Sequence, residues 1–240
     1  MTSQTNTALR GRRAALVALL MAALSPAVAH AETVEMSDYD DAVSASCPDD
    51  PCRAMTRTTG FQKRVAGVED VFTVPKNGRI VAWSVQLGTP SPKQEKFFED
   101  NFGGTPQANV TVFRVGTKKP NKGIGTNIGQ SGPQQLAGYY GQTVQFAMIN
   151  PVRVHKGDRV ALTTATWAPV LAENEATNTV WRATRPADSC GDYSAQRAIR
   201  QLGTMTPFEC QYKTERQLYG VTLITEPVPN KVPKKPKPKT

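Results

Sequence analysis

Histidine is nearly absent from this chain of 240 residues, which has two, and of these only His155 lies beyond the amino-terminal segment. A Ser-His-Asp hydrolase would have to use His155, yet no Gly-x-Ser-x-Gly nucleophile motif accompanies it. Catalytic zinc sites use several histidine or carboxylate ligands. The sequence therefore predicts no catalytic residue, no metal site and no other cofactor, and places His155 in a solvent-facing turn.

Long hydrophobic runs are also missing. The most apolar stretch, Ala14–Leu24, has about half of the roughly 20 residues that a membrane-spanning helix needs. The Arg12-Arg13 pair precedes it, and Ala29-His30-Ala31 follows it. This layout predicts a signal peptide over residues 1–31, cleaved after Ala31, and a secreted mature protein with no transmembrane segment. A retained anchor and export by the twin-arginine route remain open as alternatives.

The excess of positive charge is confined to the two ends of the chain. The net charge is +9, but the body between the leader and residue 227 is almost neutral. A nucleic-acid-binding domain spreads basic residues over a folded face, so no nucleic acid partner is expected. Residues 227–240 are rich in proline and lysine and predict a disordered basic tail, which would attract anionic cell-wall polymers or lipid headgroups, or would only aid solubility. Its lysines are Lys231, Lys234, Lys235, Lys237 and Lys239.

Cysteine occurs four times, always after the predicted leader, so disulfide bonds are expected in an exported protein. Four cysteines allow three pairings. The pairs Cys47–Cys52 and Cys190–Cys210 are favoured because each is local, and a bridge from the amino-terminal segment to the carboxyl-terminal region is the alternative. The spacings match neither the close cysteine pairs of zinc sites nor those of thioredoxin-like redox motifs.

Alternating apolar and small residues predict an all-β fold, a single β-sandwich or jelly-roll-like domain over residues 69–226. An acidic lead-in, residues 32–68, would be tethered by its cysteines. Asn77-Gly78 is a turn signal, and Lys156-Gly157-Asp158 is expected to close a hairpin. The expected strands are Val71–Val74, Arg79–Leu87, Asn109–Val115, Gln142–Ile149, Pro151–His155, Arg159–Thr166, Thr179–Ala183 and Gln217–Thr225.

One short helix is expected to interrupt the strands. Ser91 would cap it, Pro92 would occupy its first turn, Gln94 would complete a capping box, and Gly103-Gly104 would end it. Residues 118–135 are rich in glycine, proline, asparagine and glutamine and predict a long loop.

Paired carboxylates across a cleft would indicate a glycosidase. The central predicted strands carry no acidic residue, so catalysis would have to use acids of the helix or loops. These acids are Glu95, Glu99, Asp100, Glu173 and Glu175. The aspartates at 38, 40, 41, 49 and 50 lack the spacing of a calcium loop, and a hydrated acidic segment is the simpler interpretation.

Aromatic residues are the remaining candidates for binding. Exposed aromatic faces stack on sugar rings, whereas most tryptophans are largely buried, and Trp83 is expected in the core. The candidate ligand-binding residues are Trp167, Trp181, Tyr139 and Tyr140, with Tyr193 and Tyr212 also near loops or strand ends. Trp167 is the first choice, because Pro169 would stiffen its loop.

Several short sequence segments are similar to segments of a group of secreted bacterial proteins that are expected to be β-sandwiches. No activity is assigned to that group. The similar segments are Gly78–Trp83, Val154–Leu162, Thr166–Pro169, Trp181–Ala183 and Cys210–Thr214, and Cys190 also fits. The resemblance covers roughly residues 72–225 and implies the fold and secretion.

These features together predict a secreted, non-catalytic β-sandwich protein at the cell surface or cell wall, which binds a ligand or serves structurally. An anionic cell-wall polymer or a carbohydrate is the expected partner. The alternatives are a secreted polysaccharide hydrolase that uses loop carboxylates, and a subunit of a surface assembly that pairs through exposed sheet edges.

Overall fold

The computed structural model describes residues 30–37 and 42–227. The lysines of the predicted tail and most of the predicted leader lie outside the described residues, as do three aspartates of the lead-in. Residues Ala31–Glu226 form one unit, and its architecture is the subject below.

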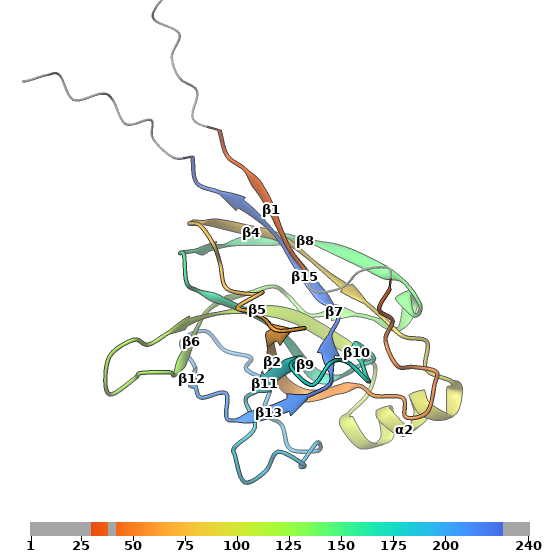
Figure 1. The fold of residues 1–240 in the computed structure, drawn as a ribbon. Helices are drawn as coiled ribbons and strands as arrows, with labels where there is room; N and C mark the ends of the chain where they lie inside the picture. Colours follow the sequence, from red (N-terminus) through yellow and green to blue (C-terminus); the bar gives the residue numbers. More distant parts are fainter. Residues whose placement is uncertain (1–29, 38–41, 228–240) are drawn as a thin grey trace, which may run out of the picture. The chain divides into compact units, whose positions relative to one another are not determined.

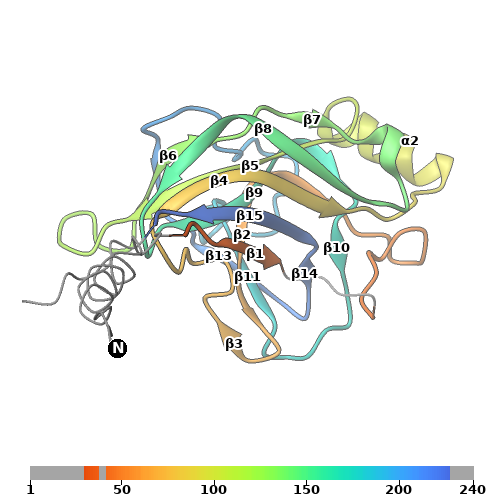
Figure 2. The ribbon, with the colours of Figure 1, turned by 90° about the horizontal axis from the view of Figure 1, so that it is seen from above.

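Antiparallel sheets dominate this unit and form a sandwich-like fold, as the sequence predicts (Figure 1). A four-stranded sheet has the order β1 (Thr33–Ser37), β15 (Tyr219–Thr225), β4 (Gly78–Gln86) and β8 (Thr143–Val154), and Figure 2 shows these strands side by side. The larger sheet has the order β12 (Met205–Thr206), β6 (Gly125–Gln130), β5 (Gln107–Val115), β9 (Arg159–Ala168), β2 (Met55–Val65), β11 (Val180–Ala183) and β13 (Cys210–Lys213). Short strands complete the fold: β3 (Val68–Glu69) on β2, β7 (Gln134–Gln135) on β5, and β10 (Leu171–Ala172) paired with β14 (Arg216–Gln217), while a 3-10 turn, η1, spans Ala137–Tyr139.

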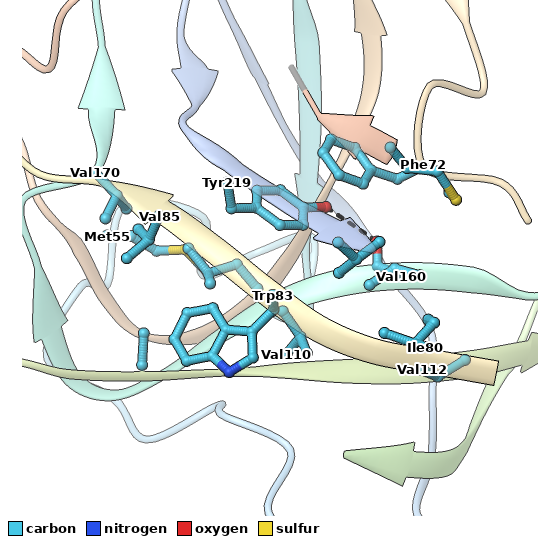
Figure 3. Close-up of a cluster of buried hydrophobic side chains, with 14 of the residues drawn as sticks. Met55, Phe72, Ile80, Trp83, Val85, Val110, Val112, Val160, Val170 and Tyr219 are labelled. Atoms are coloured by element: carbon cyan, nitrogen blue, oxygen red, sulfur yellow. Dashed lines mark hydrogen bonds between the residues drawn. The ribbon is translucent and has the colours of Figure 1, made fainter. Parts of the chain in front are cut away.

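The hydrophobic core gathers side chains from both sheets (Figure 3). In β4, Trp83 and Val85 are buried in alternation, and so is Leu87 directly after the strand. A bulge between Ile80 and Ala82 interrupts this alternation, so that Ile80 is fully buried and Val81 only partly buried. An extra residue in one strand reverses which face the following side chains occupy.

The single expected helix is confirmed as α2 (Pro92–Phe102). The Ser91 hydroxyl accepts from the Gln94 backbone, and the Gln94 side chain accepts from the Ser91 backbone, which completes the capping box. Gly103 ends the helix at φ 90°, a conformation that glycine adopts without steric cost. Both local disulfides, Cys47–Cys52 and Cys190–Cys210, are also present.

The predicted hairpin over residues 151–166 is wrong, because its two arms belong to different sheets. β8 pairs with β4, whereas β9 pairs with β5 and β2. The connection between them crosses from one sheet to the other, and Asp158 holds it. One oxygen of Asp158 accepts from the His155 backbone at 2.7 Å and from Arg114 Nη2 at 2.8 Å. A turn sequence alone cannot distinguish such a corner from a hairpin.

Other local expectations also differ from the structure. Val71–Val74 forms no strand of its own and makes one isolated bridge, from Thr73 to Arg159. The expected loop over 118–135 contains β6 and β7. Strands β1 and β2 lie within 32–68, the stretch expected to be a lead-in, and β2 is central in the larger sheet.

Strand β2 escapes detection because both of its faces are buried and both carry polar side chains. Thr58 and Thr59 are fully buried there. Their hydroxyls share hydrogen bonds with Thr184 at 3.2 Å and Thr163 at 2.9 Å, respectively. Buried hydroxyls are tolerated when they are paired, so a threonine-rich strand can lie at the centre of a sheet without an apolar pattern.

Candidate functional site

A cavity of about 230 Å³ opens beside α2. Helix α2 lies at the same end of the sheets as β10 (Figure 1). The walls of the cavity come from α2, the start of β2, and the strands β11 and β13 with the loops that follow them. We call it the aromatic pocket. Its principal lining residues are Phe97, Phe98, Trp181, Tyr193, Tyr212 and Glu215.

Two rings at the aromatic pocket remain accessible to solvent. Phe97 is 56% exposed and Tyr193 is 45% exposed. Successive residues of a helix point about 100° apart, so α2 can bury Phe98 against Trp167, with ring centroids 4.8 Å apart, while it leaves Phe97 outside. The exposure of Phe97 is therefore a consequence of helix geometry, and it gives the pocket an apolar wall that no neighbouring side chain covers fully.

Another part of the pocket wall is a stack of Trp181 on Tyr212, with ring centroids 4.3 Å apart and an interplanar angle of 21°. The two residues face each other across β11 and β13, and such cross-strand aromatic pairs stabilise a sheet. Trp181 lies across Gly60 of β2, where an added Cβ would come within 2.8 Å of the indole ring. A residue without a side chain is thus needed at this point of β2 to admit the indole.

The Glu215 carboxyl lies at the same wall. Its Oε2 accepts a hydrogen bond of 3.0 Å from Trp181 Nε1. Burial raises the pKa of Glu215 above its ordinary value, and the nearby charge of Glu173 acts in the same direction. The Trp181 hydrogen bond and the positive charges of Arg53 and Arg185 act against this rise in pKa. The result is a carboxyl group held between aromatic rings and two guanidinium groups.

Arg185 is one of the residues that line the aromatic pocket, and its side chain is only 1% exposed. Its Nη2 donates to the Thr56 carbonyl at 2.6 Å, its Nη1 to Tyr212 Oη at 3.2 Å, and its Nε to the Asp192 carbonyl at 3.2 Å. The guanidinium carbon also lies 5.1 Å from the centroid of the Tyr193 ring. A buried cation is tolerated when its donors are satisfied, and these partners fix the positions of both tyrosines.

The Cys190–Cys210 disulfide is connected to Tyr212 of the pocket wall. Tyr212 Oη donates to the Cys190 carbonyl at 2.6 Å, while Cys210 begins β13 two residues before Tyr212. Burial raises the pKa of Tyr212, so its hydroxyl stays protonated as a donor. The bridge from Cys190 to Cys210 therefore restrains the loop that carries Tyr193.

Of the four candidate ligand-binding residues, Trp181 lines the aromatic pocket and the others lie elsewhere. The first choice, Trp167, is wrong as an exposed platform because it is fully buried, and its Nε1 donates to the Gly104 carbonyl at 2.8 Å. Tyr140 is partly buried and donates to Glu95 Oε1 at 2.8 Å; burial first, and then this bond, raise its pKa. Tyr139 is 37% exposed and packs edge-on against Phe146, 5.6 Å between centroids.

Sequence reasoning missed Phe97, Arg185 and Glu215 as site residues. Phe97 could have been found from its place on the helix, since Phe98 and Phe102 define the buried face and position 97 lies outside it. No local signal distinguishes Arg185 or Glu215 from other loop residues. Both become site residues because β11 and β13 are neighbours in the sheet.

Glu215 and Glu173 lie close enough for their charges to interact, and several of the other acids that a hydrolase would need are engaged elsewhere. Glu215 is the one acid among the residues that line the aromatic pocket. Glu173 is held by Arg53 at 2.7 Å, and Asp100 by Lys96 at 3.0 Å. His155 Nδ1 accepts a hydrogen bond from Arg114 at 2.7 Å. In the part of the chain that the structure describes, no three histidine, cysteine or acidic residues are grouped to hold a metal ion.

No protein-family model, no curated protein and no solved structure matches this chain. Within residues 30–37 and 42–227, no helix has the length and apolar character that crossing a membrane requires. Function therefore has to be inferred from the geometry of the side chains described above.

Proposed function

We propose that this protein is a secreted, non-catalytic binding protein whose aromatic pocket holds a small, mainly apolar ligand. The observation that carries the proposal is the aromatic pocket itself, which is lined both by the exposed Phe97 and by the Trp181–Tyr212 stack. Ligand pockets are typically concave and apolar with a few polar groups that orient the ligand. The disulfides and the leader-like amino terminus are compatible with export.

A small ligand fits this pocket better than a polysaccharide chain. Sugar-binding platforms present a flat exposed ring with polar groups around it. Here Trp181 is 3% exposed, and its indole N–H is already bonded to Glu215. The accessible surface instead lies on Phe97 and Tyr193, which face a cavity rather than an open plane.

Replacing Phe97 with alanine is expected to weaken the binding of small aromatic compounds about tenfold. The change removes the exposed apolar wall, and burying part of a phenylalanine ring contributes on the order of 1.5 kcal/mol. Titration calorimetry with indole measures the effect.

Leu202→Ala is the matched control, because Leu202 is 66% exposed and does not line the aromatic pocket. Equal affinities of the Phe97→Ala variant and the unmodified protein for indole would refute the pocket as a binding site.

We also propose that the lysine tail retains the protein on an anionic cell-wall polymer. The support is the sequence of residues 227–240, which carry five lysines and no acid. Attraction of this kind weakens as salt rises, because exposed charges are screened. A variant that ends at residue 226 is expected to lose its salt-sensitive retention on isolated cell walls. Retention of the shortened protein at the same salt concentration as the full chain would exclude this role for the tail.

An assembly built by pairing of sheet edges has less support. Strand β8 is an edge strand, but its register with β4 breaks around Met148–Pro151, where Ile149 is 95% exposed. Bulges and prolines are features that protect an edge from pairing with another strand. This edge therefore does not present a regular strand to a partner.

A further inference from the structure

The aromatic pocket discriminates by charge as well as by shape. Resting on the proposed binding function, we infer that its ligand is an uncharged molecule of one ring or two fused rings that donates one N–H or O–H hydrogen bond to Glu215. Three observations lead to this ligand class: the unused oxygen of Glu215, the balance of charge around the pocket, and its volume.

The first observation concerns hydrogen bonds. Glu215 Oε2 accepts from Trp181, whereas Oε1 has no hydrogen bond to any other described residue. The buried Arg185 and the partly buried Tyr212 of the aromatic pocket are already engaged. Arg185 donates from all three of its nitrogens, and Tyr212 donates to the Cys190 carbonyl. A carboxylate oxygen can only accept, so the complementary group of a ligand is a donor.

The second observation is the distribution of charge. The aromatic pocket and its rim carry two cations, Arg53 and Arg185, and two acids, Glu173 and Glu215. Arg53 and Glu173 neutralise each other in an ion pair of 2.7 Å. The buried Arg185 has no ion pair with any described acid, so Glu215 is its nearest electrostatic counterpart in the pocket.

A charged ligand would disturb this balance. A cation would join Arg185, which already lies 5.1 Å from the Tyr193 centroid and 5.9 Å from the Tyr212 centroid, the rings that would otherwise attract it. An anion would meet the Glu215 carboxylate. Like charges repel at short range, and the repulsion is stronger in a partly buried site than in bulk water. A charged ligand would be attracted by one of these two groups and repelled by the other, so its charge gains little here, whereas an uncharged donor meets no repulsion.

The third observation is size. A cavity of about 150 Å³ accommodates benzene, and the aromatic pocket has about 230 Å³. One ring or a fused pair of rings therefore fits the volume of the pocket. A short alkyl or polar substituent completes the volume.

Four probes of similar size test the inference by titration calorimetry. Indole carries a donor, benzofuran has the same shape without one, and benzylammonium and benzoate carry opposite charges. Indole is expected to bind about tenfold more tightly than each of the others, since a hydrogen bond to a charged acceptor contributes at least that factor. In the Glu215→Gln variant the amide oxygen can still accept from Trp181, which turns the amide N–H₂ toward the ligand. Indole affinity is then expected to fall to the benzofuran value, and benzofuran affinity to stay unchanged.

Glu175→Gln is the matched control, because it removes the same charge from a residue outside the aromatic pocket; both affinities should be unchanged. Near-UV circular dichroism checks that the Trp181–Tyr212 stack survives each substitution. Equal binding of indole and benzofuran that still depends on Phe97 would overturn the donor inference and leave the binding function standing. Tighter binding of benzylammonium or benzoate than of indole would overturn it in favour of a charged ligand. If no probe binds, the binding function and the inference fall together.

Discussion

An Arg185→Ala variant is expected to unfold with a free energy at least about 3 kcal/mol below that of the unmodified protein. The substitution removes donors from the Thr56 carbonyl, the Asp192 carbonyl and Tyr212 Oη. Each buried acceptor left without a partner costs on the order of 1–3 kcal/mol. The side chain also packs over the Tyr193 and Tyr212 rings, so its removal leaves a void behind the aromatic pocket.

Urea denaturation, monitored by fluorescence, measures the loss of unfolding free energy. Titration with indole measures the effect of the Arg185→Ala substitution on binding at the aromatic pocket. Arg185→Lys should recover only part of the stability, because an ammonium group cannot reach three separate acceptors in the plane that the guanidinium fork spans. Arg200→Ala is the control, since Arg200 is exposed and should change stability by less than about 0.5 kcal/mol. A loss as small for Arg185→Ala as for Arg200→Ala would show that the hydrogen-bond network of Arg185 is not needed for folding.

Tyr219→Ala is expected to lower the free energy of unfolding by about 3–5 kcal/mol, the range for deletion of a large buried aromatic side chain. Tyr219 is fully buried in β15 and stacks on Phe72, with centroids 4.0 Å apart and planes 10° apart (Figure 3). Its hydroxyl donates to the Val160 carbonyl at 3.0 Å and thereby connects the smaller sheet to β9 of the larger one.

Tyr219→Phe separates the two contributions of this residue. It keeps the stack on Phe72 and removes only the hydroxyl, so a loss of about 1 kcal/mol is expected. Tyr139→Ala, at a ring that is 37% exposed, serves as the surface control and should cost less than the core deletion. Thermal and urea unfolding of the three variants give the comparison. Equal losses for the alanine and phenylalanine variants at position 219 would mean that the hydrogen bond, and not the packing, joins the sheets.

The aromatic pocket depends on contacts between distant parts of the chain. Thr56 and Arg185 are 129 positions apart, and Trp181 and Glu215 are 34 apart. Local sequence therefore could not indicate that a loop acid, a buried arginine and an exposed helical phenylalanine share one cavity. Three of the aromatic candidates, Trp181, Tyr193 and Tyr212, line the aromatic pocket, and their role in binding stays a prediction. Exposure was the misleading criterion, since Trp167 is buried and Trp181 nearly so.

The sequence alone determined what depends on a few neighbouring residues. The cap at Ser91, the glycine end of α2, the two local disulfides and the all-β character all follow from short-range chemistry. Only the tertiary structure decided which strands pair, because β8 and β9 leave their shared turn for different sheets. It also decided that the threonine-rich β2 is central, since its hydroxyls find partners on β9 and at Thr184. The pairing of strands and the burial of side chains depend on contacts throughout the whole unit, and a local sequence pattern does not contain that information.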